Sequence, residues 1–362
     1  MTNKLIGSKE ALEHFQFVTI NGKVNFEDKE RVVRIARAYS QVVKSAIRQL
    51  FDGKSIDELT KEFYNLLPNY IYLETALKQA KAIVDGLLER EDEKGGIIHA
   101  RIRKFWFCSR GNKSDKGNRN VKFRVLAKHV EVKVKDPWGE WIFGKAYFGK
   151  EYLPLLKELE ELVSKKEESY GAIISFKDGV KIHLQVPLWL YLKHFSSPKP
   201  TGYGLVAGLD LNSDRLNVVV INKDGRIIAK RTWWYSEVVS HGFPKEKARA
   251  LRLSALSEAL GFLSRIGVDY VVFEDLFLVK RRKFTRSKSG NRKISKFAKK
   301  QMLIHGVIKS LRLGFNVVLV NPKGTTNSEK HDRVMRGKGF DRHTASAYLI
   351  ALKGLGMIND IK

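Results

Sequence analysis

Three acidic residues in the C-terminal half of the chain have the types and positions that metal-dependent hydrolysis requires. Asp210 and Glu274 each end a short apolar run, and Asp341 comes just before a helix-like stretch. Two strand ends and one helix start can bring three carboxylates to one point. Phosphodiester hydrolysis by two Mg²⁺ ions uses such ligands, with the ions about 4 Å apart. We therefore predict a site for two Mg²⁺ (or Mn²⁺) ions, in which Asp210 binds both and Glu274 and Asp341 bind one each.

The order of elements around these acids predicts a fold. After residue 204, apolar runs bounded by turn residues alternate with helical patterns. The sequence predicts strands at 205–210, 216–222, 226–233, 269–274 and 315–320, and helices at 244–266, 294–312 and 342–354. Three strands in a meander, followed by alternating helices and strands, is the order of an RNase H-like α/β domain. Asp275 adjoins Glu274, but strand alternation turns it to the other face, so we expect it to support the turn.

The N-terminal half has a different pattern. We expect strands at 15–20, 97–107, 121–125, 129–134, 172–176 and 180–187, and long helices that begin near Asp28 and Tyr70. Asn21-Gly22 is typical of a turn after the first strand. The loop 109–120 is rich in glycine, polar and basic residues, so we expect it to be mobile.

These patterns predict a multidomain protein of α/β and α+β class. We expect a β-barrel-like domain that binds nucleic acid, formed by residues 1–27 and 93–195, with a helical lobe at 28–92 inserted into it. Residues 196–204 combine Ser, Pro and Gly and are the best linker in the sequence. The RNase H-like domain then spans residues 205–362.

Two groups of basic residues are candidates for contacts with nucleic acid. One group lies in the acid-free segment 276–328, directly after Glu274, where its charge falls beside the phosphate that would be cut. The other alternates with aromatic residues at 105–107 and 123, a mixture that suits stacked bases, although aromatic residues on strands are as often core. The candidates are Arg101, Arg103, Lys104, Lys122, Arg124, Lys280, Arg281, Arg282, Lys283, Arg286, Lys293, Lys296, Lys299 and Lys300.

Composition narrows the class of partner. The chain carries 67 Lys and Arg against 39 Asp and Glu, a net charge of +28, which indicates a polyanion such as nucleic acid. We expect no membrane association, because no apolar run reaches the length of about 20 residues that spans a bilayer. The single cysteine, Cys108, excludes a disulfide framework and a zinc ribbon and suits a reducing, cytoplasmic location. We expect Cys108 to be a small packed residue rather than a nucleophile.

Other catalytic motifs are missing. The sequence has no Gly-x-x-x-x-Gly-Lys-[Ser/Thr] loop and no Gly-x-Ser-x-Gly elbow, which excludes P-loop and α/β-hydrolase chemistry. His331 and His343 lie near Asp341 but have no cysteine beside them, so zinc is not expected. We expect these histidines to contact phosphate or to cap the last helix.

The C-terminal motifs resemble those of the RuvC-type nuclease domain of TnpB, the OrfB-type protein of small insertion sequences and a relative of type V CRISPR effectors. The matching segments are 208–212 (Gly-Leu-Asp-Leu-Asn), 272–276 (Val-Phe-Glu-Asp-Leu), 320–322 with Thr325 and Thr326, and 341–347 (Asp-Arg-His-Thr-Ala-Ser-Ala). The resemblance is specific over 205–352 and only organisational over 10–190. It implies a DNA endonuclease that carries a guide RNA, reads a short motif in duplex DNA and cuts with one Mg²⁺-dependent site.

The sequence departs from this family at one place. A four-cysteine zinc ribbon usually precedes the last catalytic Asp, whereas residues 327–339 contain no cysteine. An alternative is therefore a cleavage-deficient regulator of a mobile element that binds DNA or RNA, either with a guide or without specificity. A third class, a transposase that transfers strands itself, fits less well, because such enzymes of this fold run Asp, Asp, Glu and this chain runs Asp, Glu, Asp.

Overall fold

A computed structural model of the chain describes residues 4–91, 105–198, 201–278, 299–326 and 328–361. The fold is mixed α/β with more than one sheet. It divides into two compact units: a C-terminal unit, Met1–Gln16 with Phe195–Lys362, and an N-terminal unit, Phe17–His194. No helix among the described residues is both long enough and apolar enough to cross a membrane.

The C-terminal unit is built on a six-stranded sheet with the order β1-β15-β14-β11-β12-β13. Its strands are β1 (Leu5–Ile6), β11 (Leu205–Leu211), β12 (Arg215–Ile221), β13 (Ile227–Trp234), β14 (Val268–Glu274) and β15 (Asn316–Val320). Its helices are α1 (Lys9–Glu13), α7 (Lys245–Arg265), α9 (Lys299–Arg312), α10 (Glu329–Lys338) and α11 (Arg342–Ile361). The strands β11, β12 and β13 form an antiparallel meander, and β14, β15 and β1 add to β11 in parallel. The strands predicted after residue 204 are confirmed to within about two residues.

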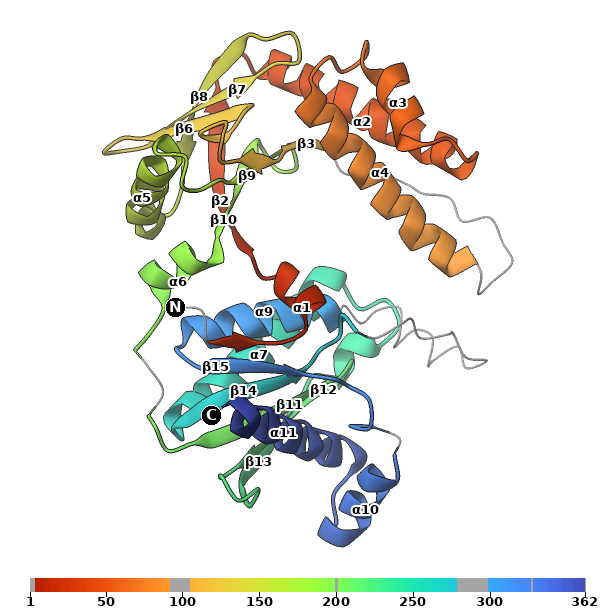
Figure 1. Ribbon diagram of the computed structural model, residues 1–362, viewed down its shortest axis with the longest axis vertical. Coiled ribbons are helices and arrows are strands. Elements are labelled where there is room, and N and C mark those ends of the chain that lie inside the picture. Colours follow the sequence, from red (N-terminus) through yellow and green to blue (C-terminus); the bar gives the residue numbers. More distant parts are fainter. Residues whose placement is uncertain (1–3, 92–104, 199–200, 279–298, 327, 362) are drawn as a thin grey trace. The chain divides into compact units, whose positions relative to one another are not determined.

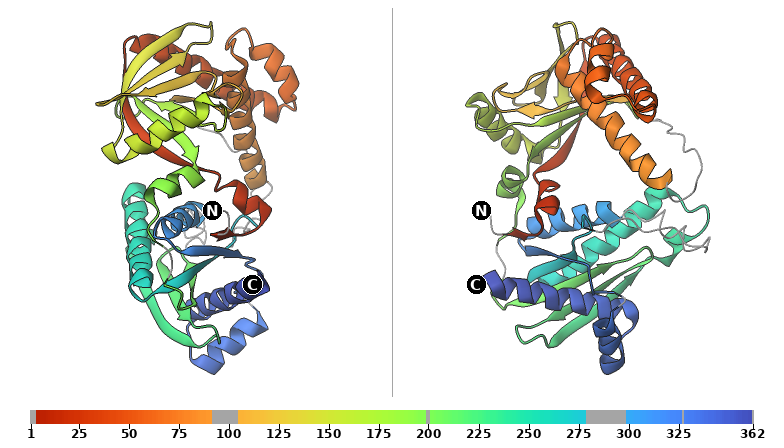
Figure 2. Two further views of the ribbon diagram at one scale, coloured as in Figure 1. Left: turned by 60° about the vertical axis from the view of Figure 1, so that its left-hand side comes forward. Right: turned by 45° about the vertical axis from the view of Figure 1, so that its right-hand side comes forward.

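Helix α11 covers one face of this sheet (Figures 1 and 2). A Cβ on Gly208 of β11 would lie 2.1 Å from the backbone oxygen of Ala347, and one on Gly354 would lie 2.4 Å from Val272. Only glycine therefore lets α11 approach β11 and β14 this closely. Val206, Val272 and Val318 pack with α11 residues in one buried cluster, which holds α11 on this face of the sheet.

Helices α7 and α9 cover the opposite face (Figure 2, left). A Cβ on Gly306 of α9 would lie 3.0 Å from the ring of Phe273, and that ring is fully buried. The sheet is thus enclosed on both sides, which explains why β11, β14 and β15 are apolar along nearly their whole length.

The first residues of the chain belong to this C-terminal unit, whereas the sequence placed residues 1–27 in the β-barrel-like domain. Leu5 and Ile6 pair in parallel with Val317 and Val318 of β15. A two-residue strand carries no periodicity of its own, so its partner could not be read from the sequence.

The N-terminal unit holds a seven-stranded antiparallel sheet with the order β3-β9-β10-β2-β8-β7-β6. Its strands are β2 (Phe17–Phe26), β3 (Trp106–Ser109), β6 (Val121–Val125), β7 (Val130–Lys135), β8 (Trp141–Tyr147), β9 (Gly171–Ser175) and β10 (Lys181–Pro187), with a small pair β4 (Gly111–Asn112) and β5 (Gly117–Asn118). Its helices are α2 (Lys29–Phe51), α3 (Ile56–Phe63), α4 (Tyr70–Glu91), α5 (Leu153–Ser164) and α6 (Leu188–Phe195).

The predicted turn at Asn21-Gly22 is wrong, because β2 runs straight through it. Asn21 pairs with His183 and Gly22 with Ile182 of β10. A Cβ on Gly22 would lie 2.9 Å from the ring of Phe148, so this glycine makes room for an aromatic ring rather than for a turn. Pairing along β10 overrides the local preference of Asn-Gly.

The loop 109–120, which the sequence predicts to be mobile, is packed against its neighbours at its C-terminal end. Asn118 is fully buried and donates to the backbone oxygens of Ser109 at 3.0 Å and Tyr170 at 3.1 Å, while its own oxygen accepts from the Asn120 amide. A Cβ on Gly111 would lie 2.7 Å from the Tyr170 oxygen. The glycines permit close packing here.

Helix α2 begins where the sequence predicts. The side chain of Asp28 accepts the Arg31 amide at 2.9 Å and caps the helix. The predicted linker is pinned at its end, where Thr201 and Gly202 donate to the buried carboxylate of Asp269 at 3.1 and 2.9 Å. The chain thus enters β11 in a fixed position.

Candidate active site

Asp210 and Glu274 lie next to each other at the carboxyl ends of two adjacent strands. In the parallel pair of β11 and β14, Leu209 is in register with Phe273, and the two acids are the next residues on each strand. Residues in register project from the same face, and neighbouring strands are about 4.8 Å apart. Because Gly208 faces α11, Asp210 and Glu274 face the same side.

Asp341 caps the helix that starts on this face. Its Oδ1 accepts the amides of His343 at 3.0 Å and Thr344 at 3.2 Å, and the Thr344 hydroxyl donates to Oδ2. Asn217, the cross-strand partner of Asp210, donates to that hydroxyl oxygen at 3.4 Å. Burial raises the pKa of Asp341, but the hydrogen bonds from Thr344 and His343 outweigh it and leave the pKa below its ordinary value. Asp341 is therefore ionised at neutral pH.

Asp210 is held by two side chains of the same face. Its Oδ2 accepts from Asn212 Nδ2 at 2.7 Å and lies 3.0 Å from His343 Nδ1, and the residue is only 5% exposed. The loop that carries Asn212 is itself fixed, because Tyr235 donates to the Asn212 oxygen at 3.0 Å and Arg252 donates to the Ser213 oxygen at 3.0 Å. Burial raises the pKa of Tyr235, which keeps it a neutral donor. The position of Asp210 is thus set by the fold around it.

Glu274 is held from the turn that follows β15. The buried hydroxyl of Thr325 donates to Glu274 Oε1. Lys353 of α11 donates to the Asn321 oxygen at 2.9 Å and so ties that turn to the helix. Burial lowers the pKa of Lys353, and the negative charge of Glu274 opposes this shift. Thr325 belongs to the Thr-Thr pair that the sequence analysis singled out.

The donor set suits a hard divalent cation. Asp210 and Glu274 face α11 at the carboxyl end of the sheet, and Asp341 caps the start of α11. Oxygen ligands are what Mg²⁺ prefers. Beside them, the side-chain oxygen of Asn217 is buried and accepts no hydrogen bond from any residue that the structure describes. Within the described ranges, however, no three His, Cys, Asp or Glu side chains are gathered as a ligand set. A metal ion would have to take the place of the hydrogen bonds that now hold Asp210 and Asp341.

Two neighbouring residues support this face; the sequence predicts that role for Asp275, whereas for His331 it predicts a contact with phosphate or a cap on the last helix. Asp275 is buried, accepts from Ser8 Oγ at 2.6 Å and from the Phe277 amide at 3.1 Å, and so fastens the N-terminal segment to the end of β14. His331 of α10 is buried, with its Nε2 2.9 Å from the Arg342 oxygen and 3.2 Å from Ser346 Oγ. It fixes the start of α11. His343, by contrast, contacts Asp210 itself.

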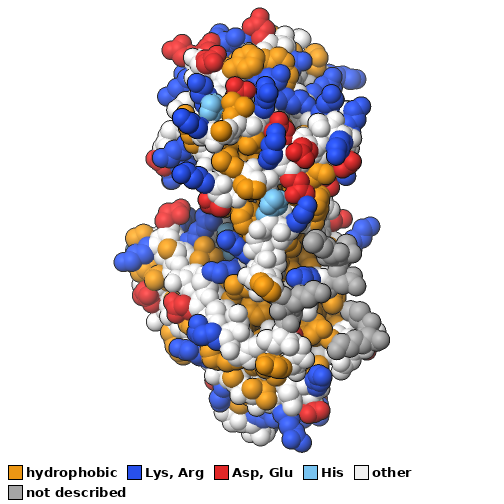
Figure 3. Space-filling view, turned by 90° about the vertical axis from the view of Figure 1, so that its left-hand side faces the viewer, with side chains coloured by type: hydrophobic (Ala, Val, Ile, Leu, Met, Phe, Trp, Pro, Cys, Tyr) orange, Lys and Arg blue, Asp and Glu red, His pale blue; other side chains and the backbone are white. Residues whose placement is uncertain are grey.

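Most of the predicted basic contacts fall outside the described residues: Arg101, Arg103, Lys104, Lys280, Arg281, Arg282, Lys283, Arg286, Lys293 and Lys296. Lys299 and Lys300 begin α9, and the Lys300 ammonium lies 5.5 Å from the centre of the Phe277 ring. On the face shown in Figure 3, Lys and Arg side chains are scattered among acids and apolar groups. A continuous basic stripe is not visible on that face.

Several residues of the basic strands in the N-terminal unit, which the sequence predicts to contact nucleic acid, instead make contacts within the fold. Lys122 Nζ donates to the backbone oxygens of Asp115 and Lys116, and burial lowers its pKa. Phe107 is 1% exposed and packs edge-on against Tyr72, so it belongs to the core. Arg124 remains exposed. Burial raises the pKa of Cys108 to about 11, which agrees with a packed thiol rather than a nucleophile.

One pair that the sequence analysis missed lies on the same face as Asp210. The guanidinium of Arg215 is 4.1 Å from the centre of the Trp234 ring, and Trp234 is 62% exposed. Arg215 is in register with Trp234, two residues from the Asn217 that pairs with Asp210. Strand alternation therefore places the pair on the face of the acids. The spacing Asp210, Asn217, Arg215 was visible in the sequence, but only the register reveals that these positions are neighbours.

Comparison with known proteins identifies relatives over the whole chain. A family model described as the SSO2105 N-terminal domain matches residues 17–196, which coincides with the N-terminal unit. A protein of Aeropyrum pernix is 28% identical over 223 residues, covering 57% of this chain and 60% of its own length. SSO2105 of Saccharolobus solfataricus is 81% identical over 363 residues, covering all of this chain and 98% of its own length.

Two solved structures show a more distant likeness. A Cas12f1–sgRNA–target DNA complex is matched over 90% of this chain and 83% of its own, with 12% identity and a TM-score of 0.44. A CRISPR–Cas12f ternary complex is matched over 89% and 81%, with 12% identity and a TM-score of 0.35. By its identity to SSO2105 over essentially the full length of both proteins, the chain belongs to the SSO2105 family.

Proposed function

We propose that this protein is a Mg²⁺-dependent endonuclease that hydrolyses phosphodiester bonds at Asp210, Glu274 and Asp341. The observation that carries the proposal is the placement of Asp210 and Glu274 on adjacent parallel strands, one residue past the same register pair, with Asp341 at the start of the helix that covers that face. The strand order β13-β12-β11-β14-β15 supports it, because an RNase H-like domain has the same meander followed by parallel strands.

Each side chain has a role in this proposal. Asp210, Glu274 and Asp341 would hold the metal ions, which when bound stabilise the attacking and leaving oxygens of the phosphate. His343 and Asn212 orient the Asp210 carboxylate, and Thr325 orients that of Glu274. The exposed Trp234 offers a stacking surface for the strand beside the acids, and Arg215, which is paired with Asp214 at 3.1 Å, lies on its ring.

The substrate that we propose is target DNA, selected by a bound guide RNA as in TnpB-like proteins. The net charge of +28 supports a polyanionic ligand, and the segments around the three acids have the order Asp, Glu, Asp of that family. A cleavage-deficient nucleic-acid-binding regulator is the second candidate. Its support is that α10 follows the Thr325-Thr326 turn where such nucleases carry a zinc ribbon, and that the acids already have hydrogen-bond partners.

The test compares Asp210→Ala with Asp224→Ala, an exposed acid in the hairpin turn between β12 and β13. RNA that copurifies with the protein is sequenced, and cleavage of duplex DNA matching it is measured with Mg²⁺ and with EDTA. We expect Asp224→Ala to cut like wild type and Asp210→Ala to lose at least about 10³-fold in rate, with DNA affinity retained within a few-fold. Equal cleavage by both variants contradicts the site. Binding without cleavage by wild type supports the regulator.

A further inference from the structure

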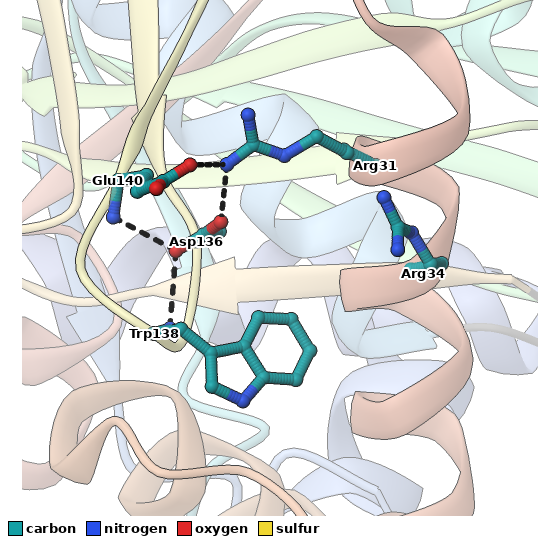
Figure 4. A pocket seen from close by; sticks show the side chains of 5 residues that line it. All are labelled: Arg31, Arg34, Asp136, Trp138 and Glu140. Carbon is teal, nitrogen blue, oxygen red and sulfur yellow. Dashed lines mark hydrogen bonds and ion pairs between the residues drawn. The ribbon is translucent and has the colours of Figure 1, made fainter.

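The N-terminal unit contains a small cavity beside an exposed tryptophan. It lies where the first turns of α2 meet the turn between β7 and β8, has a volume of about 250 Å³, and is lined by Arg31, Arg34, Asp136, Trp138 and Glu140 (Figure 4). Trp138 is 64% exposed, although burying an indole is strongly favourable. An aromatic ring kept in solvent at the edge of a polar cavity is a surface on which another ring can stack.

The turn that carries Trp138 is closed by hydrogen bonds within it. The Asp136 Oδ1 accepts the amides of Trp138 at 3.0 Å and Glu140 at 2.9 Å, and the Glu140 oxygen accepts the Asp136 amide at 2.8 Å. Gly139 has φ +109°, which residues with a side chain rarely adopt. The turn is thus held in one conformation before any ligand arrives, which lowers the entropy lost on binding.

One arginine of the cavity is engaged and the other is available. Arg31 Nη2 lies 2.5 Å from Asp136 Oδ2 and 2.7 Å from Glu140 Oε2, and so fastens α2 to the turn. Arg34, one turn further along α2, is exposed and has no ion pair or hydrogen bond with any residue that the structure describes. Figure 4 shows its guanidinium and the Trp138 indole bordering the same space.

The charges of the lining select the kind of ligand. Two arginines and two carboxylates cancel, so the cavity is formally neutral in a chain of net charge +28. A phosphate gains no net attraction from such a lining. A planar ring that both donates and accepts hydrogen bonds suits it better, because Arg34 offers donors and the Glu140 carboxylate offers acceptors.

We propose that this cavity binds a single unpaired guanine of a nucleic acid. Guanine presents O6 and N7 as paired acceptors, which match a guanidinium, and N1–H with the 2-amino group as paired donors, which match a carboxylate. Trp138 stacks on the ring, Arg34 binds O6 and N7, and Glu140 accepts from the other edge. The volume is below the roughly 300 Å³ at which small-molecule sites begin, so it fits one base and not a duplex.

The proposal rests on the proposed function only in taking nucleic acid as the ligand. The two can fail separately. If the protein cuts DNA but shows no guanine preference, only the guanine site is contradicted. If it prefers guanine but does not cut DNA, only the nuclease function is contradicted.

The test measures binding of single-stranded oligouridylates of about 10 nucleotides, in RNA and DNA form, that carry one central base. The central base is guanine, hypoxanthine, 7-deazaguanine or uracil, and the protein carries Asp210→Asn so that nothing is cut. Hypoxanthine lacks the 2-amino donor and 7-deazaguanine lacks the N7 acceptor. We expect guanine to bind about tenfold more tightly than uracil, with the two analogues between them.

Variants with matched controls assign each contact. Trp138→Ala abolishes the preference for guanine, while Trp189→Ala, an exposed tryptophan of the same unit, keeps it. Arg34→Ala removes the difference between guanine and 7-deazaguanine, while Arg37→Ala, also exposed and one turn further along α2, keeps it. Glu140→Gln removes the difference between guanine and hypoxanthine. Thermal melting confirms that each variant is folded.

Two results with Trp138→Ala overturn the proposal. The first is a Trp138→Ala variant that keeps the wild-type affinity and guanine preference. The second is a Trp138→Ala variant that weakens all four probes equally, because that indicates contact with the backbone instead of a base. Trp138→Phe, which keeps a stacking ring, is expected to retain most of the preference. If Trp138→Phe is folded but loses the guanine preference completely, that result also contradicts stacking.

Discussion

Asp136 in the N-terminal unit and Asp210 in the C-terminal unit are both 5% exposed, yet they are held by different partners. Asp136 is paired with the guanidinium of Arg31 at 2.5 Å. Asp210 is held by the amide of Asn212 and the imidazole of His343, and by neither a guanidinium nor an ammonium group among the described residues. An acid neutralised by a cation of its own fold contributes to stability. Asp210 has an amide and an imidazole as partners instead, and under the proposed function its carboxylate would bind a metal ion.

The kind of hydrogen-bond partner does not by itself identify a functional acid, as a third buried acid shows. Asp269 is 3% exposed and accepts from Thr201 and from the amides of Gly202 and Gly204. These donors are neutral, but they satisfy both of its oxygens, and Asp269 lies near the start of β14, at the end of the strand opposite Glu274. What distinguishes Asp210 is its position at the carboxyl end of the sheet, where Glu274 ends the adjacent parallel strand.

The largest expected effect compares Asp136→Ala with Asp210→Ala in stability. Asp136→Ala leaves Arg31 without its buried partner and two amides without an acceptor, so we expect it to lower the free energy of unfolding by about 3 kcal/mol. Asp210→Ala removes a buried charge and is expected to change it by less than about 1 kcal/mol. Urea denaturation measures both. If Asp210→Ala lowers the free energy of unfolding as much as Asp136→Ala does, Asp210 is a structural acid and the two residues do not differ in role.

The second effect concerns Trp234, the exposed aromatic ring on the face of the acids. Trp234→Ala is expected to raise KM for cleavage about tenfold with little change in kcat, because stacking holds the strand in the ground state and the transition state alike. Trp234→Phe should recover most of the loss. Trp138→Ala serves as the control in the other unit. Its effect should depend on the guanine content of the substrate and not on the cleavage step. A fall in kcat for Trp234→Ala would instead place this ring close to the reacting phosphate.

The third effect is stabilisation by metal. If Asp210, Glu274 and Asp341 hold Mg²⁺, the folded state binds it and the unfolded state does not, so Mg²⁺ at ten times its Kd adds about 1.4 kcal/mol. Differential scanning calorimetry with Mg²⁺ and with EDTA measures the shift. Asp210→Ala should abolish it, whereas Asp136→Ala should preserve it despite its lower stability. An equal response to Mg²⁺ in wild type and Asp210→Ala contradicts metal binding at this face.

Much of this arrangement could be predicted from the sequence, for physical reasons. Strands that are buried on both faces, such as β11 and β14, are continuous apolar runs that end abruptly at a charge. Such runs locate Asp210 and Glu274 within a residue of the strand ends. Asp341 was visible because it caps a long helix, and N-caps are polar residues just before an apolar period.

The rest depends on pairing between distant segments, which no local pattern encodes. The contact between His343 and Asp210 needs α11 to cross β11 at Gly208, and the Arg215–Trp234 pair needs the register of β12 with β13. The turn predicted at Asn21-Gly22 was wrong for the same reason, since β10 pairs through it. Long-range pairing decides these cases and overrides local propensity.

The smallest effect separates two roles of Asp341, capping and metal binding. Asn caps a helix about as well as Asp, so Asp341→Asn should keep the free energy of unfolding within a few tenths of a kcal/mol, whereas Asp341→Ala should lose about 1 kcal/mol. Both should lose cleavage, because neither keeps a carboxylate for the metal. The pKa of Asp341 is lowered in the folded state, so its charge stabilises the fold above the ordinary value of 3.8 and this contribution is lost as pH falls further. The free energy of unfolding of the wild type should therefore fall relative to that of Asp341→Asn only below about pH 4. Full cleavage by Asp341→Asn would reduce Asp341 to a cap, and the C-terminal acids would then differ less from those of the N-terminal unit than their partners suggest.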